Sequence, residues 1–586
     1  MKLQAILKAI TTAFVAVSQA NNITYNVVSL VPHNQTMGVL IDDRIYPLTE
    51  TNKDSTLLHY GKAPKSNSGH YKYVILLKDN HQMVQCENFT RVVTRQVKST
   101  LNECFGRPWN KFNLPLLPTI LPPLPVINRV QTKLHVDGEI PVIHLFGNQS
   151  EIDLVHKNQT SDIKIELNMT YISPKDIKSF QSITIGLSGH STRGMSKLSY
   201  KLKMKKGTDL YGYRNIKLRA TSADRSYMRD KLAYDITRSV GLPSSGYSYV
   251  RLYINNQAIG LFGVAEAFKK PWSANEFNHG HKKQEHGTLY TTDVGNGKNI
   301  FGSASDDTFG GKKNKTEPVY DEINRVGRST CDLSYLGNNV SLYSSGQYSV
   351  KEEPTVGTAN FTKIMDLTKF ISQQPNTTQA DNSTVSLWEE RIDVDSFLRG
   401  MALEVILSNS DGYLVTGNNY MLYDDNKSGR LILSEQDFDL VMGTSMYNIT
   451  AMHGGDYTEF PGFTVRPLMP RLLAVPQFKQ DYESLLVNIT KHLVNPKILM
   501  PVIDGLYSML FEEVTWDQSL PRVGSDLLLD LIEKSNSSAV NSGRSLFSNA
   551  TFKEAVYGPD LSNSTMNLKQ WLAFRSNNLL MFFNEK

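Results

Sequence analysis

Two aspartates near the end of an apolar run are the first residues whose spacing suggests chemistry. The stretch LILSEQDFDLVMG, residues 431–443, passes from strand-like residues into Asp437 and Asp439. In a regular strand, residues two apart share one face, so both carboxylates can reach the same ion. Mg²⁺ prefers one or two carboxylates, completed by water. The alternative is that the two acids end an ordinary strand in a solvated turn.

A second polar loop follows an expected helix over residues 394–407, which has an apolar face. The sequence SNSDGYLVTGNNYMLY places Asp411 directly after this helix and Asn418 and Asn419 before a short strand. A carboxylate at such a position can orient a hydroxyl nucleophile, and an asparagine is a candidate ligand of a second metal ion. Asp-Gly and Asn-Asn are also common turn residues, so an ordinary loop is the alternative.

Basic residues occupy one side of an expected strand over residues 197–205. Lys197 and Lys201 alternate with apolar residues, and Arg193 lies in the glycine- and serine-rich loop that precedes them. A lysine can meet a nucleotide phosphate as a point charge. The alternative for both lysines is a solvated strand face. The apolar side of this strand consists of Leu198, Tyr200, Leu202 and Met204.

The elements around these residues follow a recognisable order. A helix is expected over residues 226–240, because Met228, Leu232, Ile236 and Val240 recur at a spacing of four. A hairpin with its turn at Asn255-Asn256 follows, then a polar segment, the helix over 394–407, and a second hairpin that leads to the acid pair. This is the order of parts in a kinase-type nucleotide-binding fold, although the GxGxxG, HRD and DFG motifs are missing.

Several separated segments resemble the CotH kinase family of spore-coat proteins, and the fungal branch found in Mucorales is the most similar. These segments are SGHSTRGMSKLSYKLKM, ADRSYMRDKLAYDI, VGLPSSGYSYVRLYINNQAIGLFGVAEAF, NNYMLY with SEQDFDLVMG, and PLMPRLLAVPQFKQDYESLL. The resemblance implies an atypical protein kinase-like fold. Bacterial members of that family phosphorylate coat proteins. Fungal members are cell-surface or spore-coat proteins, and some are invasins that bind host-cell receptors.

The resemblance also implies roles for individual residues, with ATP and Mg²⁺ or Mn²⁺ as cofactors. Family members commonly have Pro-Trp before the acid pair, where this chain has Glu435-Gln436, which changes the packing beside the acids. Structural salt bridges explain Arg229 and Glu266 as well as nucleotide contacts do. The implied roles are Asp411 as catalytic base, Asp437, Asp439 and Asn419 as metal ligands, and Lys197, Lys201, Arg193, Arg229 and Glu266 as nucleotide-binding residues.

The expected fold is α+β, an atypical protein kinase-like two-lobed fold preceded by a small N-terminal β-rich domain. Short Val-, Ile- and Tyr-rich runs predict that β-rich domain, and the proline-rich stretch after it predicts an ordered linker. The expected division is a signal peptide at 1–20, the β-rich domain at 21–115, the linker at 116–135, a kinase-like N-lobe at 136–270, a hinge with a polar, partly disordered insertion at 271–390, and an α-rich C-lobe at 391–586.

Features spread over the whole chain predict secretion. The first residues, MKLQAILKAITTAFVAVSQA, fit a signal peptide, and Asn-x-Ser/Thr sequons recur from Asn22 to Asn563. In an oxidising compartment Cys86 and Cys104 can pair, which leaves Cys331 as a buried thiol. A net charge of +5 over 586 residues gives no reason to expect nucleic acid as a partner. We also expect no transmembrane anchor and a location in the spore coat or on the cell surface.

Three functions remain open on the sequence. The first is a secreted kinase that phosphorylates Ser or Thr on proteins of the spore coat or cell surface. The second is a kinase-fold adhesin or invasin that binds host-cell receptors with little or no catalysis. The third, a secreted carbohydrate-binding protein, rests only on the N-terminal β-rich part.

Overall fold

A computed structural model gives the arrangement of the chain. It describes residues 22–585 apart from 67, 94–96, 190, 270, 282–284, 293–330, 345–346, 377–383, 446–448, 528–549 and 560–564. The expected signal peptide therefore lies outside the described residues. The expected mixture of helices and sheets is confirmed, whereas the kinase-like two-lobed arrangement stays a prediction.

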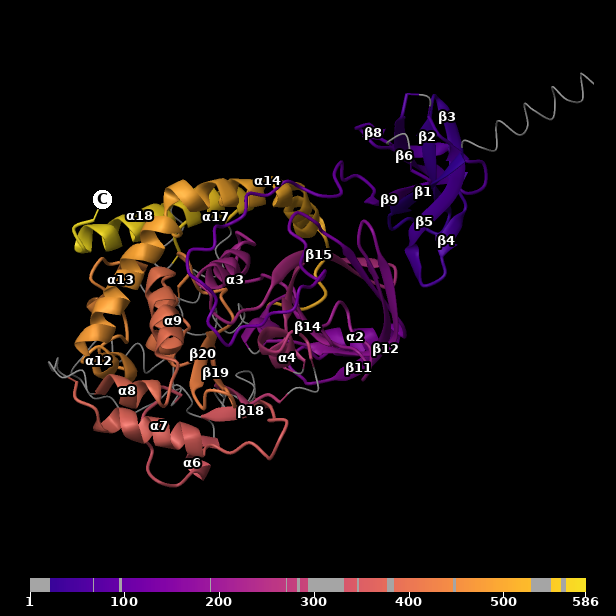
Figure 1. The fold of residues 1–586 in the computed structure, drawn as a ribbon. Helices are drawn as coiled ribbons and strands as arrows, with labels where there is room; N and C mark the ends of the chain where they lie inside the picture. The colour runs from indigo at the N-terminus through magenta and orange to yellow at the C-terminus, as the bar shows by residue number, and fades with distance from the viewer. Residues whose placement is uncertain are drawn as a thin grey trace, which may run out of the picture.

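The N-terminal part consists of two small sheets that stand to one side of the molecule (Figure 1). Alternation drives these strands, since Ile23, Tyr25 and Val27 are buried together while the residues between them are not. One sheet has the order β4-β5-β1-β9, and the other joins β3, β2, β6 and β7, with β8 paired to β6. The strands are β1 (Asn22–Val28), β2 (Gln35–Ile41), β3 (Arg44–Leu48), β4 (Glu50–Asn52), β5 (Ser55–Pro64), β6 (His70–Leu77), β7 (Met83–Cys86), β8 (Arg91–Val92) and β9 (Ser99–Cys104).

A closed barrel forms the centre of the molecule, with the strand order β10-β11-β12-β13-β14-β16-β15 (Figure 1). It closes through a parallel pair, β10 with β15, and all other neighbours are antiparallel. The expected hairpin is confirmed as β15 and β16, with its turn at Asn255. The strands are β10 (Val142–Phe146), β11 (Lys164–Ile172), β12 (Ile177–Leu187), β13 (Tyr200–Lys203), β14 (Asn215–Arg219), β15 (Tyr247–Ile254) and β16 (Gln257–Glu266).

Short helices flank the barrel, and α3 is the one that matters for the site. Its apolar stripe is confirmed, because Met228, Leu232, Ile236 and Val240 are all fully buried. The helix begins later than expected, at Arg229, and ends at Ser239. The flanking helices are α2 (Gln149–Lys157), α3 (Arg229–Ser239) and α4 (Trp272–Phe277), with the 3₁₀ turn η1 (Ser191–Gly194) before β13.

The polar segment over residues 271–390 is more ordered than a surface insertion would be. It supplies β17 (Leu289–Thr292) and β18 (Tyr348–Glu352), which form the sheet β18-β17-β19-β20 with the second hairpin. It also supplies α6 (Ser341–Ser344), α7 (Thr362–Gln373) and α8 (Thr384–Glu389), and Ile364 and Ile371 of α7 are fully buried. Its most polar, glycine-rich part, residues 293–330, lies outside the described residues.

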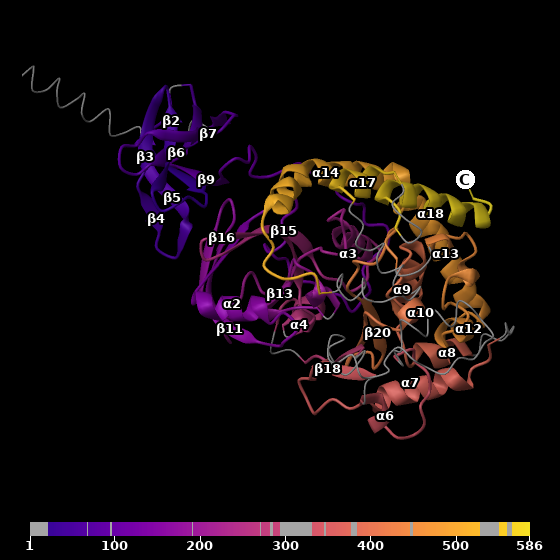
Figure 2. The same cartoon turned by 180° about the vertical axis from the view of Figure 1, so that it is seen from behind.

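The last third of the chain forms a helical layer beside the sheet of β19 and β20 (Figure 2). The expected helix after residue 393 is confirmed as α9, which Asp393 caps through the Ser396 backbone N–H. The elements are α9 (Val394–Ile406), α10 (Tyr413–Thr416), β19 (Tyr420–Asp424), β20 (Leu431–Glu435), α11 (Ile449–Met452), η2 (Tyr457–Glu459), α12 (Leu468–Leu472), α13 (Pro476–His492), α14 (Pro496–Ser519), α17 (Phe552–Tyr557) and α18 (Leu568–Phe582).

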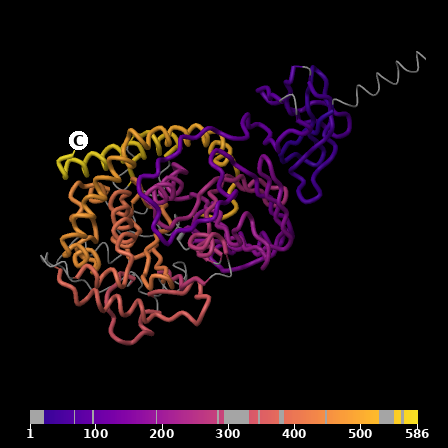
Figure 3. Tube along the Cα trace, viewed as in Figure 1, coloured from indigo at the N-terminus to yellow at the C-terminus, as the bar shows by residue number. Residues whose placement is uncertain are grey.

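The proline-rich segment, residues 114–127, has neither helix nor strand and packs against the body of the molecule (Figure 3). The backbone N–H of Ile120 donates to the carbonyl of Ser239, at the end of α3. Arg399 of α9 donates to the carbonyl of Pro122 over 2.7 Å. A side chain at Gly241 would lie 2.2 Å from that carbonyl oxygen, so glycine is required for the close approach.

The predicted cysteine pairing is wrong. Cys86 and Cys104 are not joined, since Cys86 lies on β7 and Cys104 on β9, in different sheets. Cys331 is buried, as expected, and its Sγ contacts the carbonyl oxygen of Gln347. Among the described helices, none is long and apolar enough to cross a membrane.

Candidate functional site

The acid pair lies against one arginine that the sequence did not single out. Nη1 of Arg219 is 2.5 Å from Asp437, Nη2 is 3.2 Å from Asp439, and Nε is 2.9 Å from Asp230. The guanidinium thus gathers carboxylates from the loop after β20 and from α3. We call Arg219, Asp230, Asp437, Asp439 and Asp411 the acid cluster.

Strand β14 places Arg219 there by simple alternation. Ile216 and Leu218 are fully buried in the core, so Lys217 and Arg219 share the opposite face. The charge of Asp437 raises the pKa of Lys217, although burial and its cationic neighbours lower that pKa overall. Lys217 therefore faces the same acids as Arg219 and adds a second positive charge beside them.

The expectation that the two aspartates lie on a strand is wrong. β20 ends at Glu435, and Asp437 has a left-handed backbone with a φ of 65°. Helix α3 stabilises this turn, because the N–H of Asp437 donates to the Tyr234 hydroxyl and that of Phe438 donates to Asp230. The shared contact with Arg219, rather than a strand pleat, brings the two carboxylates together.

Asp411 approaches the same cluster from the end of α9. Its carboxylate accepts hydrogen bonds from Thr416 and from Nδ2 of Asn419, over 2.9 and 2.8 Å. Burial raises the pKa of Asp411 to about 6, and the negative charge of Asp437 contributes to the rise. A carboxyl group whose pKa lies near neutrality is suited to general base catalysis.

Glu404 of α9 fixes the loop that carries Asp411. Its buried carboxylate accepts the N–H groups of Tyr413 and Leu414, over 2.5 and 2.7 Å, at the start of α10. Burial raises the pKa of Glu404 to about 8, although these hydrogen bonds lower it. Gly412 leaves the room for this contact, since a side-chain Cβ there would lie 2.5 Å from Glu404 Oε1.

The carboxylate oxygens of the acid cluster are of the chemical type that binds Mg²⁺. Burial and the neighbouring acids, Asp437 first, raise the pKa of Asp439 well above its usual value, although Arg219 lowers it, so several acidic oxygens lie close together here. Carboxylate oxygens, completed by water, are the ligands that Mg²⁺ prefers. However, no group of three or more acidic, histidine or cysteine side chains among the described residues is arranged to hold a metal ion. Arg219 holds Asp437 and Asp439 in this arrangement.

Lys197 does not join the acid cluster. It lies before β13, which begins at Tyr200, and so does not share a strand face with Lys201. Its Nζ is 2.9 Å from the buried Asp517 of α14 and donates to the Leu261 carbonyl. Burial lowers its pKa to about 8, although Asp517 raises it. We interpret Lys197 as a structural link between the barrel and α14.

Lys201 and Arg193 point to a different partner. Arg193 lies 2.6 Å from Asp162, and Lys201 lies 3.8 Å from the same carboxylate. Lys201 on β13 is paired directly with Lys217 on β14. The sequence analysis therefore selected a lysine on the strand next to the one that carries Lys217 and Arg219. In this arrangement Arg193 positions the loop before β13.

Arg229 and Glu266 are both buried and have their ionic partners outside the acid cluster. Arg229 is fully buried, pairs with Asp224 over 2.6 Å, and donates to the carbonyl oxygens of Met442 and Met566. It therefore fixes the chain just after the acid pair. Glu266 ends β16, as expected, and lies 3.4 Å from His135.

Glu435 lies just before the acid pair, where the family resemblance led us to expect part of a Pro-Trp sequence. The side chain is buried, and neither carboxyl oxygen has a hydrogen-bond partner among the described residues. Burial and the nearby Glu404 raise its pKa well above the usual value. The neighbouring Gln436 reaches Thr291 of β17 over 3.4 Å. The wall beside the acids thus contains a buried carboxyl group whose charged form is disfavoured by burial and by Glu404.

Comparison with known proteins gives a consistent picture. The family described as CotH kinase protein matches residues 185–521, which contain all the residues of the acid cluster. The chain is 27% identical to Invasin CotH3 of Rhizopus delemar over 88% of this chain and 78% of that protein. It is 23% identical to Spore coat protein homolog 1 of Rhizopus delemar over 78% of this chain and 67% of the relative.

A bacterial relative is similar over a shorter part of this chain. Inner spore coat protein H of Bacillus subtilis is 23% identical over 65% of this chain and 89% of its own length. Nearly the whole bacterial protein is therefore represented here.

Proposed function

Because this chain belongs to the CotH family, we propose that it is a spore-coat or cell-surface kinase. It transfers a phosphoryl group from ATP to serine or threonine hydroxyls of coat or secreted proteins. Relatives named as spore coat proteins and invasins support a location at the coat or surface. The sequons and the N-terminal apolar run support secretion of a glycosylated chain.

The convergence of distant charged residues carries this proposal. Asp411 follows α9, Asp437 and Asp439 follow β20, and Lys217 and Arg219 come from β14 of the barrel. The charge of Asp437 contributes to the raised pKa values of both Asp411 and Asp439, which supports the proximity of the three acids. Acids and bases from separate parts of a chain that gather in one place and shift one another's pKa values mark a candidate site for a charged ligand.

Each residue has a role in this proposal. Mg²⁺ or Mn²⁺, when bound, would supply positive charge to the phosphates of ATP. Asp437 and Asp439 would hold that ion, and Asn419 would support the site through its hydrogen bond to Asp411. Asp411 orients the attacking hydroxyl and accepts its proton. Lys217, and not Lys197 or Lys201, offers the positive charge to the phosphates.

The test is transfer of label from ATP. The purified full chain is incubated with γ-labelled ATP, Mg²⁺ or Mn²⁺, and casein, and we expect labelling of the chain or of casein. Asp437→Asn should abolish it. Asp366→Asn is the matched control, because Asp366 is exposed on α7, away from the cluster. Equal labelling by both variants would contradict the proposed role of the acid cluster.

An adhesin or invasin with little or no catalysis is the second candidate. Two observations favour it: Arg219 already pairs with both aspartates, and the relatives include proteins named Invasin CotH3 and Invasin CotH2. In that case ATP with Mg²⁺ would neither label the protein nor raise its melting temperature. The chain, tagged for detection, would still bind saturably to cultured host cells, and the Asp437→Asn variant would bind equally well.

A further inference from the structure

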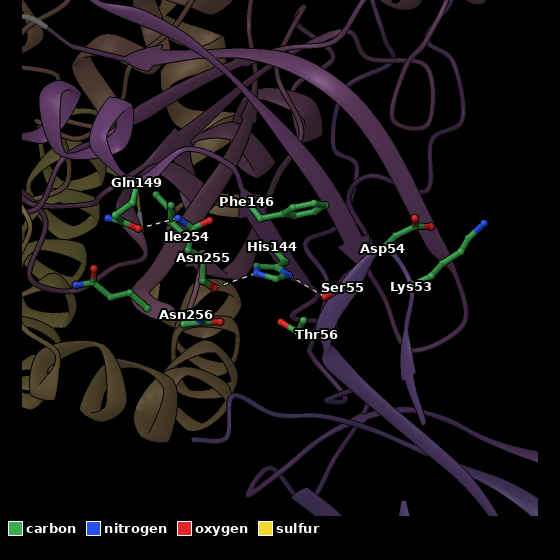
Figure 4. Close-up of a pocket in the computed structure, with 11 residues that line it drawn as sticks. Lys53, Asp54, Ser55, Thr56, His144, Phe146, Gln149, Ile254, Asn255 and Asn256 are labelled. Atoms are coloured by element: carbon green, nitrogen blue, oxygen red, sulfur yellow. Dashed lines mark hydrogen bonds between the residues drawn. The ribbon is translucent and has the colours of Figure 1, made fainter. Parts of the chain in front are cut away.

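A second site lies far from the acid cluster, where the N-terminal β part meets the barrel. A cavity of about 560 Å³ opens between the β4–β5 turn and one end of the barrel (Figure 4). Its volume falls in the range of small-molecule sites, roughly 300–1,000 Å³. We propose that this cavity binds a short neutral saccharide.

The walls of the cavity are fixed by packing between the two parts. Leu57 and Leu58 of β5 pack against Val142, Ile172 and Tyr253 of the barrel. The hydroxyl of Thr170 donates to the backbone carbonyl of Asp54 over 2.5 Å. The turn that carries one side of the cavity is therefore held in place before any ligand arrives, which lowers the entropic cost of binding.

A buried histidine joins the two walls. Nε2 of His144 lies 3.0 Å from the carbonyl oxygen of Asn255, and Nδ1 lies 2.9 Å from the hydroxyl of Ser55, as Figure 4 shows. Because a carbonyl only accepts, Nε2 carries the proton, and neutral His144 accepts from Ser55 through Nδ1. Burial lowers the pKa of His144, which agrees with a neutral ring.

Polar side chains remain available around this fixed frame. Within the described part of the chain, no hydrogen bond or ion pair involves the side chains of Lys53, Thr56, Asn256 or Gln257, although all of them line the cavity. Amide and hydroxyl groups offer both donors and acceptors, as the hydroxyls of a sugar require. By contrast, Gln149 and Asn255 bond to each other over 2.7 Å and serve as structure.

Charge and shape select among the possible ligands. Lys53 stands next to Asp54 in the lining, so the cavity offers no excess positive charge to a phosphate or carboxylate. The half-buried ring of Phe146 provides a flat apolar surface, tilted against His144 at a centroid distance of 5.4 Å. An aromatic surface among amides suits the C–H face of a sugar ring with its hydroxyls at the rim.

The test measures saccharide binding by the full chain. All proteins carry Ser150→Ala, which removes the sequon at Asn148 beside the cavity while Asn148 still caps α2 through the Ser150 N–H. Cello-, chito- and manno-oligosaccharides are titrated by calorimetry and saturation-transfer NMR. We expect one class of oligosaccharide to bind. The double variant Asn256→Leu/Gln257→Leu should raise the Kd for that oligosaccharide at least about tenfold.

Matched controls keep the result interpretable. Gln82→Leu changes an exposed glutamine of the N-terminal part outside the cavity and should bind as the parent does. Asp437→Asn should also bind normally, so loss of kinase activity and loss of saccharide binding can be told apart. The proposal fails if no saccharide binds, if the double variant binds equally well, or if ATP or inorganic phosphate displaces the sugar.

Discussion

Lys217 and Arg219 occupy alternate positions of β14, and their surroundings give the two residues different tasks. Arg219 contacts three carboxylates directly, whereas Lys217 forms no ion pair with any of the described residues and is influenced mainly by burial and by Asp437. A cation that is close to acids but not locked to them is the better candidate for a phosphate contact.

Replacing this lysine should therefore separate the two candidate roles. Lys217→Met should lower the initial rate of phosphoryl transfer by about 10²-fold or more, the usual effect of losing one stabilising charge. Lys201→Met is the matched control, since Lys201 is the cross-strand neighbour but lies near Asp162. Radiolabel incorporation measures both rates. An equal loss in the two variants would mean that barrel integrity, and not the charge of Lys217, sets the rate.

The buried side chain of Glu435 lowers the stability of the fold. Its buried carboxyl group has no hydrogen-bond partner among the described residues. A buried polar group in this state costs about 1–3 kcal/mol. Glu435→Met, of similar length, should raise the free energy of unfolding by about this amount, measured by denaturant titration. Glu435→Gln, which keeps an unpaired polar group, should leave it nearly unchanged. A less stable methionine variant would show that the carboxyl group has a partner after all.

At the scale of elements, the regular periodicities of the sequence were sufficient for α3, α9 and the two hairpins. Each has a long run with a single period and a clear end, such as Gly241 after α3. The barrel could not be foreseen, because it closes through β10 and β15, whose paired residues Val142 and Arg251 are far apart in the chain.

The candidate site was only partly predictable for the same reason. The acids stand at the ends of recognisable elements, so Asp411 and Asp437 could be found from the sequence. In contrast, NIKLR, residues 215–219, is short and reads as a solvated strand until Asp437 and Asp439 arrive from much later in the chain. Lys197 was misplaced because the alternation continues upstream of Tyr200, where the strand itself begins.

The loop between α9 and α10 gives a prediction at this scale. Gly412→Ala would place a Cβ 2.5 Å from Glu404 Oε1, in the contact that holds Tyr413 and Leu414. We expect the loop to shift, with Asp411 displaced and phosphoryl transfer lost. Gly429→Ala is a comparison variant in a turn with open space around it, although its positive φ of 73° adds backbone strain. Crystal structures of both variants would show whether only Gly412→Ala moves Asp411.

At the scale of the whole molecule, the N-terminal β part should respond to acid. Burial lowers the pKa of His59 to about 4, whereas the unfolded chain binds this proton near pH 6.5. The unfolded state therefore takes up more protons between these values, and stability falls as the pH drops from 6.5 towards 4. The full loss is about 3 kcal/mol.

Hydrogen exchange of β1 and β5 between pH 7 and 4.5 can measure this loss. His59→Gln should make the stability of these strands less dependent on pH. His33→Gln, at an exposed histidine of the same part, should keep the full dependence. If both variants lose stability with acid as the parent does, another buried group controls the transition.

The proline-rich segment has a consequence for biosynthesis. The carbonyl of Pro122 accepts a hydrogen bond from Arg399, and Pro115 packs beside Gly505. Both partners are synthesised hundreds of residues after the proline-rich segment. At roughly 5–20 residues per second, the nascent chain keeps this apolar strip uncovered for tens of seconds. Chaperones have that interval in which to hold it.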